Sequence, residues 1–167
     1  LDGLKSHFEW EDSAEITIEA NPDDLTEPFL AALSKTEVNR LSIGLQSFKD
    51  EDLILMNRAH NADASRECLE RARKYGFSNI TVDLIYGLPQ QSSADWQWQL
   101  QQLLDYDVPH FSAYALTVEP KTVLAKWVEK GKVQLDEGMA SAHFEYLQDF
   151  AKANGYRHYE LSNFARK

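Results

Sequence analysis

Three segments of this chain alternate apolar residues with small or polar ones, and each has a side chain that could bind a ligand on its polar face. The segments are "EITIEA" (15–20), "NRLSIGLQS" (39–47) and "NITVDLIYG" (79–87). Side chains two residues apart in a strand point to the same face, which places Glu19, Gln46 and Asp83 on the polar faces. A carboxylate such as Asp83 inside a buried strand is costly unless a partner stabilises it. We therefore expect these three faces to share a polar space and a ligand.

Two further side chains follow the second segment, in the stretch "NRAH", and they leave the chemistry of that ligand open. Glu19, Asp83 and His60 could bind a divalent metal, because carboxylate and imidazole groups suit several metals. Alternatively, the carboxylates could accept hydrogen bonds from hydroxyls or an amine of a small molecule, while Arg58 binds its carboxylate in a bidentate geometry. Each polar residue could also be an ordinary structural group of the sheet.

Strand-like segments alternate with helical patterns along the chain. We expect strands at 15–20, 39–47, 79–87, 110–118 and 157–165, and helices at 26–35, 50–57, 63–75, 93–105 and 137–154. This order predicts βαβ units, a parallel sheet and an α/β fold. Central parallel strands are normally apolar on both faces, whereas these have one polar face. The pattern therefore indicates part of a barrel, with functional groups near the C-terminal ends of the strands, and a single domain over 1–167.

Several smaller signals have a structural and a functional interpretation. We expect Asp63 to cap its helix and Cys68, on the inner stripe of that helix, to be a buried core thiol. Tyr114 is expected to be a core aromatic. For the last segment, the sequence leaves open whether polar residues face the cavity or are plain strand residues: Tyr159, Ser162 and Asn163.

Composition excludes some classes of function. The formal net charge of −10 over 167 residues disfavours nucleic acid and anionic membranes as partners. No apolar run approaches the roughly 18 residues of a membrane span. The single cysteine excludes an internal disulfide framework and indicates a reducing compartment, most simply the cytoplasm. The start, "LDGLKSHF", resembles the end of a helix already under way, so we expect the chain to be a fragment of a longer protein.

Five segments, in order, resemble the radical S-adenosylmethionine proteins of the oxygen-independent coproporphyrinogen III oxidase family. They are "ITIEANPDDLT", "VNRLSIGLQSFKDEDLILMNRAHNADAS", "GFSNITVDLIYGLPQQS", "HFSAYALTVEPKT" and "YELSNFA". Each motif alone is weak to moderate, and together they extend over nearly the whole chain. The last two segments look more like the heme-chaperone-like branch than the authentic oxidase branch.

The resemblance implies a partial (β/α) TIM barrel that holds S-adenosylmethionine and a 4Fe-4S cluster. By motif, Glu19 would meet the methionine amino group and Arg58 the methionine carboxylate, while Gln46 and Asp83 would contact the ribose hydroxyls. In the family, the reduced cluster cleaves the cofactor to a 5′-deoxyadenosyl radical. The authentic oxidase then converts two propionates of coproporphyrinogen III to vinyl groups. The other functions that remain open are a heme chaperone without oxidase activity and a divalent-metal barrel enzyme.

The family binds its cluster with three cysteines in a C-x-x-x-C-x-x-C loop, and this sequence departs from that pattern. It contains one cysteine, Cys68, at a position expected to be core. The resemblance therefore places the cluster ligands before Leu1 and a substrate-binding C-terminal domain after this segment. We expect the fragment alone to be inactive, and the complete protein to bind a porphyrinogen or heme and to need an electron donor for its cluster.

Overall fold

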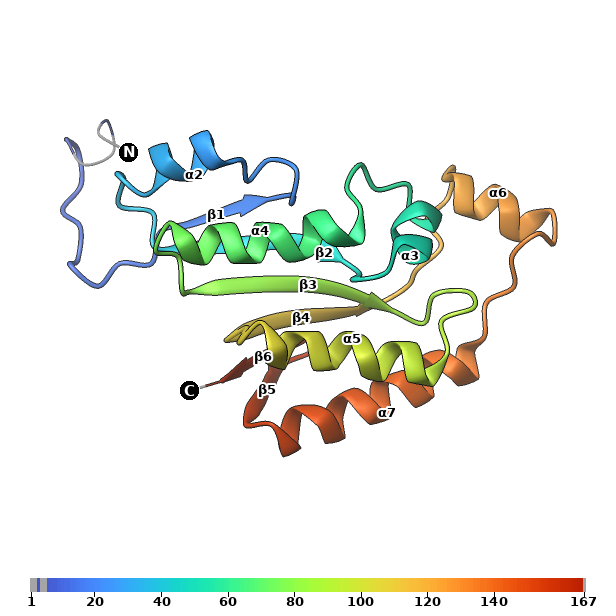
Figure 1. Ribbon diagram of the computed structural model, residues 1–167. Coiled ribbons are helices and arrows are strands. Elements are labelled where there is room, and N and C mark those ends of the chain that lie inside the picture. The colour runs from blue at the N-terminus through green and yellow to red at the C-terminus, as the bar shows by residue number, and fades with distance from the viewer. Residues whose placement is uncertain (1–2, 4–5, 167) are drawn as a thin grey trace.

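The computed structural model describes residue 3 and residues 6–166 (Figure 1). Its strands are β1 (Thr17–Ala20), β2 (Arg40–Gln46), β3 (Ile80–Tyr86), β4 (His110–Ala115), β5 (Tyr156–Glu160) and β6 (Asn163–Arg166). Its helices are α2 (Glu27–Leu33), α3 (Asp50–Leu55), α4 (Ala62–Lys74), α5 (Ser93–Asp105), α6 (Val123–Glu129) and α7 (Glu137–Ala153). None of the helices described is long and apolar enough to cross a membrane.

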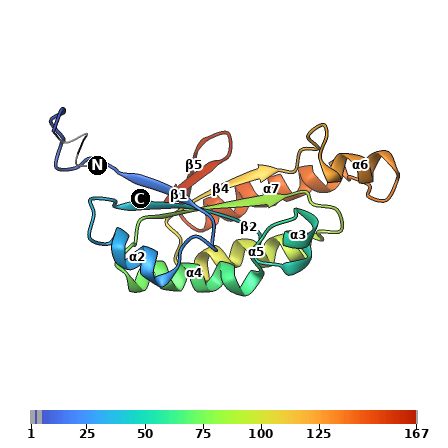
Figure 2. The same ribbon diagram turned by 90° about the horizontal axis from the view of Figure 1, so that it is seen from above.

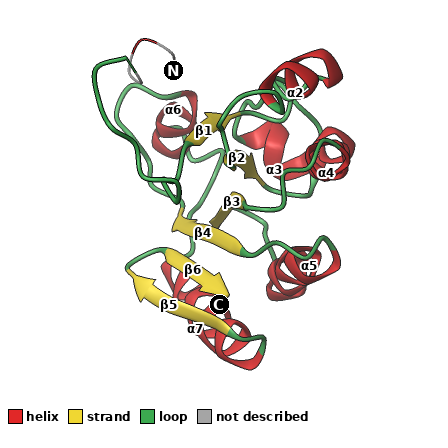
Figure 3. Cartoon of the chain, turned by 90° about the vertical axis from the view of Figure 1, so that its left-hand side faces the viewer, coloured by secondary structure: helices red, strands yellow, loops and turns green. Residues whose placement is uncertain are grey.

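The six strands form one sheet in the order β1-β2-β3-β4-β6-β5. The first four are parallel to their neighbours, whereas β6 is antiparallel to β4 and β5 is antiparallel to β6. Seen along the strands, the sheet follows an open arc (Figure 3). The predicted α/β fold with parallel strands is confirmed, and the open curved sheet is consistent with part of a TIM barrel.

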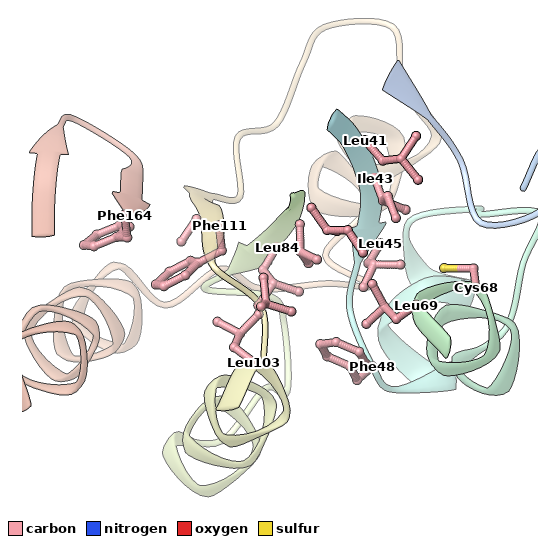
Figure 4. Packing of buried hydrophobic residues seen from close by; sticks show 14 of the residues in the cluster. Leu41, Ile43, Leu45, Phe48, Cys68, Leu69, Leu84, Leu103, Phe111 and Phe164 are labelled. Carbon is pink, nitrogen blue, oxygen red and sulfur yellow. The ribbon is translucent and has the colours of Figure 1, made fainter. Parts of the chain in front are cut away.

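Helices cover one face of the parallel strands. Figure 2 shows α2, α3, α4 and α5 together on one side of the sheet, and α7 packs against α5, β3 and β5. The helical face of β2 is fully buried at Leu41, Ile43 and Leu45, and residues such as Leu69 of α4 pack there (Figure 4). The expected inward stripe of α5 (Trp96, Leu100 and Leu103) is also fully buried. The opposite face of these strands is consequently left for polar side chains.

Two local predictions were wrong, and one helix was missed. The N-cap of α4 is Asn61, whose side chain accepts a hydrogen bond from the amide of Ala64, whereas Asp63 lies in the first turn and pairs with Arg66. The segment expected to be one strand at 157–165 is the β5–β6 hairpin, because it turns back at residues 161–162. Helix α6 was not predicted, and its seven residues include none that is buried.

A buried polar network ties the end of β2 to α3 and α5. The Ser47 hydroxyl lies 2.7 Å from Asp52 Oδ2, and Gln99 donates to the same oxygen from Nε2 at 3.0 Å. Gln99 Oε1 in turn accepts a hydrogen bond from the backbone amide of Phe48 at 3.0 Å. Asp52 is 6% exposed, and its burial raises the pKa of the carboxyl. One amide side chain therefore satisfies both a buried carboxylate and the backbone beyond β2.

We predict that Gln99→Leu will destabilise the chain by about 3 kcal/mol at neutral pH, because Asp52 and the Phe48 amide lose their partner in a buried setting. Urea denaturation will measure the change in the free energy of unfolding. Loss of the Gln99 amide raises the folded-state pKa of Asp52 further. The destabilisation that comes from the Asp52 carboxylate therefore applies only while this carboxyl is ionised. The deficit should shrink as the pH falls through that pKa.

The matched control is Gln101→Leu, an exposed position on the same helix. It should change the free energy of unfolding by no more than about 0.5 kcal/mol. Equal destabilisation by the two substitutions would show that the network does not stabilise this end of the sheet.

Candidate functional site

All four residues predicted to bind a cofactor line one cavity on the polar face of the sheet. The cavity has a volume of about 760 Å³, and Glu19, Gln46, Arg58 and Asp83 are all among its lining residues. Alternation along β1, β2 and β3 explains why Glu19, Gln46 and Asp83 lie on the same side of the sheet, because these strands bury their other side chains against the helices. The binding roles of these residues remain predictions, and their convergence is a property of the fold.

Glu19 enters the cavity from β1, where the strand is short and the side chain is exposed. Its carboxylate forms no hydrogen bond or ion pair with the residues that the structure describes. In register, Glu19 lies opposite Ser42 of β2, whose small side chain also lines the cavity. The Glu19 carboxylate is thus free to accept hydrogen bonds from an ammonium or hydroxyl group of a ligand.

Gln46 lies at an irregularity that ends β2. Its φ is 67°, in the left-handed region that residues other than glycine rarely adopt, and the pairing of β2 with β3 shifts register between Ile43 and Gln46. Such irregularities redirect a side chain at the end of a strand. Gly44 leaves room for it, because a Cβ at Gly44 would lie 3.0 Å from Gln46 Nε2 and 3.6 Å from Arg58 Nη2.

Arg58 reaches the cavity from the loop between α3 and α4. Its Nη2 donates to Asn21 Oδ1 at 2.5 Å and to the carbonyl oxygen of Gly44 at 3.2 Å, which links the ends of β1 and β2. Its Nε and Nη1 groups form no hydrogen bonds with the described residues. The guanidinium is therefore held in place by one nitrogen, while two others remain available to a carboxylate.

Asp83 lies midway along β3, half-buried in the floor of the cavity. Desolvation is the main reason that the pKa of its carboxyl is raised, and the Glu19 carboxylate raises it further. The Arg40 guanidinium acts in the opposite direction, as would a hydrogen bond from the Ser112 hydroxyl if its proton turned toward Asp83. The carboxylate that looked misplaced in an apolar strand thus faces a polar space, as the alternation predicted.

Arg40 was not identified from the sequence as a site residue, although it also lines the cavity. Its Nε and Nη2 donate to Thr81 Oγ1 at 3.1 and 2.5 Å, and its Nη1 forms an ion pair with Glu15 Oε1 at 2.7 Å. The signal was present, because Arg40 has the same alternation in β2 as Gln46. Its existing partners indicate that it neutralises charge at the N-terminal end of the strands.

His60 does not join Glu19 and Asp83, so the metal set considered from the sequence is wrong. It is buried, and its Nε2 donates to the Leu45 carbonyl oxygen at 3.1 Å, while its Nδ1 lies 3.9 Å from Asp23 Oδ1. Burial lowers the pKa of the imidazole. Among the residues that the structure describes, no group of three or more His, Cys, Asp or Glu side chains could hold a metal ion.

The aromatic and amide residues of the last two segments lie nearer the cavity than expected. Tyr114 is 44% exposed and lines the cavity, so the expectation of a core aromatic was wrong. Tyr159 and Asn163 also line it, whereas Ser162 is not among the lining residues. Tyr114 shares its face of β4 with His110 and Ser112, which the alternation could have indicated, but only the fold shows that β5 and β6 bend back to the cavity.

The chemistry of the lining suits S-adenosylmethionine. Glu19 and Asp83 can accept hydrogen bonds, the free nitrogens of Arg58 can bind a carboxylate, and Gln46 can donate and accept. Gly44 has no side chain, and the space beside it lies next to Gln46 and Arg58. Any other residue at position 44 would place a Cβ in this space. A ligand with an amino acid group and vicinal hydroxyls therefore fits this set of partners.

The chain was compared with known proteins. The family model of the radical SAM superfamily matches residues 6–102. A Bacillus subtilis protein named heme chaperone HemW is 40% identical over 156 residues, which is 93% of this chain and 41% of the relative. A mouse protein named "Radical S-adenosyl methionine domain-containing protein 1, mitochondrial" is 41% identical over 92% of this chain and 35% of its own length.

The fold also matches solved structures. The Escherichia coli coproporphyrinogen III oxidase HemN, described as a radical SAM enzyme, aligns with a TM-score of 0.80 and 27% identity over 98% of this chain and 38% of its own. The archaeal Elp3 of Methanocaldococcus infernus aligns with a TM-score of 0.66 at 21% identity, which supports the fold alone. The chain thus spans roughly two fifths of the length of its curated relatives. From its matched family model and the fold around its cavity, the chain belongs to the radical SAM superfamily.

Proposed function

We propose that this chain is the S-adenosylmethionine-binding part of a heme-handling protein, of the kind named heme chaperone in its bacterial relatives. The observation that supports this most is that Glu19, Gln46, Arg58 and Asp83 line one cavity on neighbouring strands. The family match supports the cofactor, and the names of the curated relatives support a heme-related ligand. A cytoplasmic location, expected from the single cysteine, is part of the same proposal.

Each of the four side chains has a distinct task in this proposal. Arg58 binds the methionine carboxylate through one charge-assisted hydrogen bond, from either Nε or Nη1, because Nη2 already donates to Asn21 and Gly44. Glu19 accepts hydrogen bonds from the methionine amino group. Gln46 and Asp83 bind the ribose hydroxyls, and the Asp83 carboxylate can accept hydrogen bonds from both of them. Together they orient the cofactor and replace the water that would otherwise solvate it.

The cofactor and a 4Fe-4S cluster would together supply radical chemistry in the complete protein. The cluster ligands are not in this chain, because its single thiol is unsuitable. Cys68 is fully buried, its thiol donates to the carbonyl oxygen of Ser65 at 3.1 Å, and burial raises its pKa to about 12, so it does not form the thiolate that a cluster needs. We propose that three cysteines from another part of the protein bind the cluster, which an electron donor reduces.

Coproporphyrinogen III oxidase is the second candidate function, supported by the HemN structure that this fold matches. An oxidase would turn over coproporphyrinogen III, whereas a chaperone would bind heme without this reaction. We predict that the complete, anaerobically reconstituted protein will bind heme stoichiometrically, followed by its Soret absorption, and will form no vinyl product from coproporphyrinogen III. Vinyl products formed at a rate dependent on S-adenosylmethionine would instead establish the oxidase.

We predict that Arg58→Ala in the complete protein will weaken S-adenosylmethionine binding about thirtyfold, because the cofactor carboxylate loses its charge-assisted hydrogen bond. Isothermal titration calorimetry will measure the dissociation constant. Arg58→Lys should recover only part of the loss, since one ammonium cannot replace the planar guanidinium that donates to Asn21, Gly44 and the ligand at once.

Arg66→Ala is the matched control, because Arg66 is an arginine of α4 that pairs with Asp63 outside the cavity. It should leave the dissociation constant within about twofold of the parent protein. If Arg58→Ala behaves like this control, Arg58 does not bind the carboxylate.

We predict a pH dependence of cofactor affinity that arises from Asp83. The ribose hydroxyls donate to the ionised carboxylate, and the pKa of Asp83 is raised above that of an ordinary aspartate, mainly by burial. Affinity should therefore be full above this raised pKa and fall as the pH is lowered through it. Asp83→Asn should weaken binding at neutral pH and flatten this part of the profile. A parent profile with the same shape as that of Asp83→Asn would refute the assignment.

A further inference from the structure

Four polar residues lie side by side in a row across β3, β4, β6 and β5. Asp83 is the register partner of Ser112, Ser112 is the partner of Asn163, and Asn163 is the partner of Glu160. The first three line the cavity, whereas Glu160 is exposed at the outer end of the row. The row therefore connects a residue of the cofactor-binding set with the surface of the β5–β6 hairpin.

The hydrogen bonds in this row have a direction that Glu160 sets. An ionised carboxylate can only accept, so the contact between Glu160 Oε2 and Asn163 requires the Nδ2 group of Asn163 to donate. The Asn163 hydrogen bond lowers the pKa of Glu160, which keeps that carboxyl ionised. The Oδ1 atom of Asn163 then faces the other way and accepts the Ser112 hydroxyl at 2.8 Å.

This direction matters at Asp83 because a serine hydroxyl has one proton to donate. With that proton on the bond to Asn163, Ser112 cannot also donate it to Asp83, and both carboxylate oxygens remain free to accept. If the amide of Asn163 turned over, its Nδ2 would donate to Ser112, and the hydroxyl would turn toward Asp83. It would then occupy one lone-pair position of the carboxylate and make the carboxylate a weaker acceptor for the two hydroxyls of a ligand.

We propose that Ser112, Asn163 and Glu160 are positioning residues that direct the Ser112 proton away from Asp83, so that the carboxylate can accept both hydroxyls of a vicinal diol. The inference rests on the proposed function, in which that diol is the ribose of S-adenosylmethionine. By this inference, the β5–β6 hairpin and its exposed Glu160 affect the affinity for the cofactor without contacting it.

The test uses substitutions of Glu160 in the complete protein to reverse the direction of the hydrogen bonds in the row. Glu160→Lys replaces an acceptor with a group that can only donate, so Asn163 should turn its Oδ1 toward the lysine and its Nδ2 toward Ser112. We expect S-adenosylmethionine, titrated by calorimetry, to bind roughly tenfold more weakly. Glu160→Gln, which can still accept through its amide oxygen, should stay within about twofold of the parent protein.

A second substitution separates this mechanism from an effect of charge or of a disturbed hairpin. Ser112→Ala removes the proton in question, so alone it should change affinity by no more than about twofold. In the double variant Glu160→Lys/Ser112→Ala, affinity should return to the level of Ser112→Ala, because no hydroxyl remains to occupy Asp83. Charge repulsion or misfolding would persist in the double variant.

Two results would overturn the inference: a double variant as weak as Glu160→Lys, or a Ser112→Ala variant that itself loses most of its affinity. Unchanged affinity in Glu160→Lys would do the same. Failure of the proposed function is distinguishable from these outcomes, because the parent protein would then bind no S-adenosylmethionine at all.

Discussion

The two-sided packing of β2 is the constraint on which the cavity depends. Leu41, Ile43 and Leu45 are fully buried under the helices, and each such side chain contributes about 2 kcal/mol through burial. A shift of one residue would place all three in the cavity and move the polar residues between them into the core. The apolar contacts therefore determine the register of the strand, and with it the positions of Ser42, Gly44 and Gln46.

The same alternation explains how much of the site could be predicted from the sequence. A period of two identifies the polar face of each strand, and four residues inferred from it and from the family motifs do line one cavity. The period of two does not indicate the left-handed backbone conformation of Gln46. It also cannot orient a loop, which is why His60 was grouped with Glu19 although it turns toward Asp23.

Larger departures came from parts of the chain without a clear period. The last segment has no glycine or proline to mark its turn at residues 161–162, so two antiparallel strands resembled one. Helix α6 is short, at seven residues, and none of them is buried, so no side of it faces the core. Nor does alternation show which strands become neighbours. The pairing of β6 with β4, and thus of Asn163 with Ser112, follows from the fold as a whole.

The strained end of β2 is held by hydrogen bonds on both sides of Gln46. Arg58 donates to the carbonyl oxygen of Gly44, and His60 donates to that of Leu45. Beyond Gln46, Ser47 belongs to the buried network of Asp52 and Gln99. A left-handed residue costs about 1–3 kcal/mol, and these bonds, each worth about 1 kcal/mol, offset that cost. Arg58 thus shapes the strand end, while its Nε and Nη1 form no hydrogen bond with the described residues.

The remaining strain in the cavity is electrostatic, and a ligand can relieve it. Burial raises the cost of ionising the Asp83 carboxyl, and the Glu19 carboxylate adds to that cost. Arg40 offsets this only in part, because Thr81 and Glu15 already hold its guanidinium. A ligand that brings an ammonium to Glu19 and hydroxyls to Asp83 supplies the missing partners, so stability lost in the free protein becomes binding free energy. By this argument Asp83 costs the ligand-free chain stability, and a neutral residue in its place would make that chain more stable.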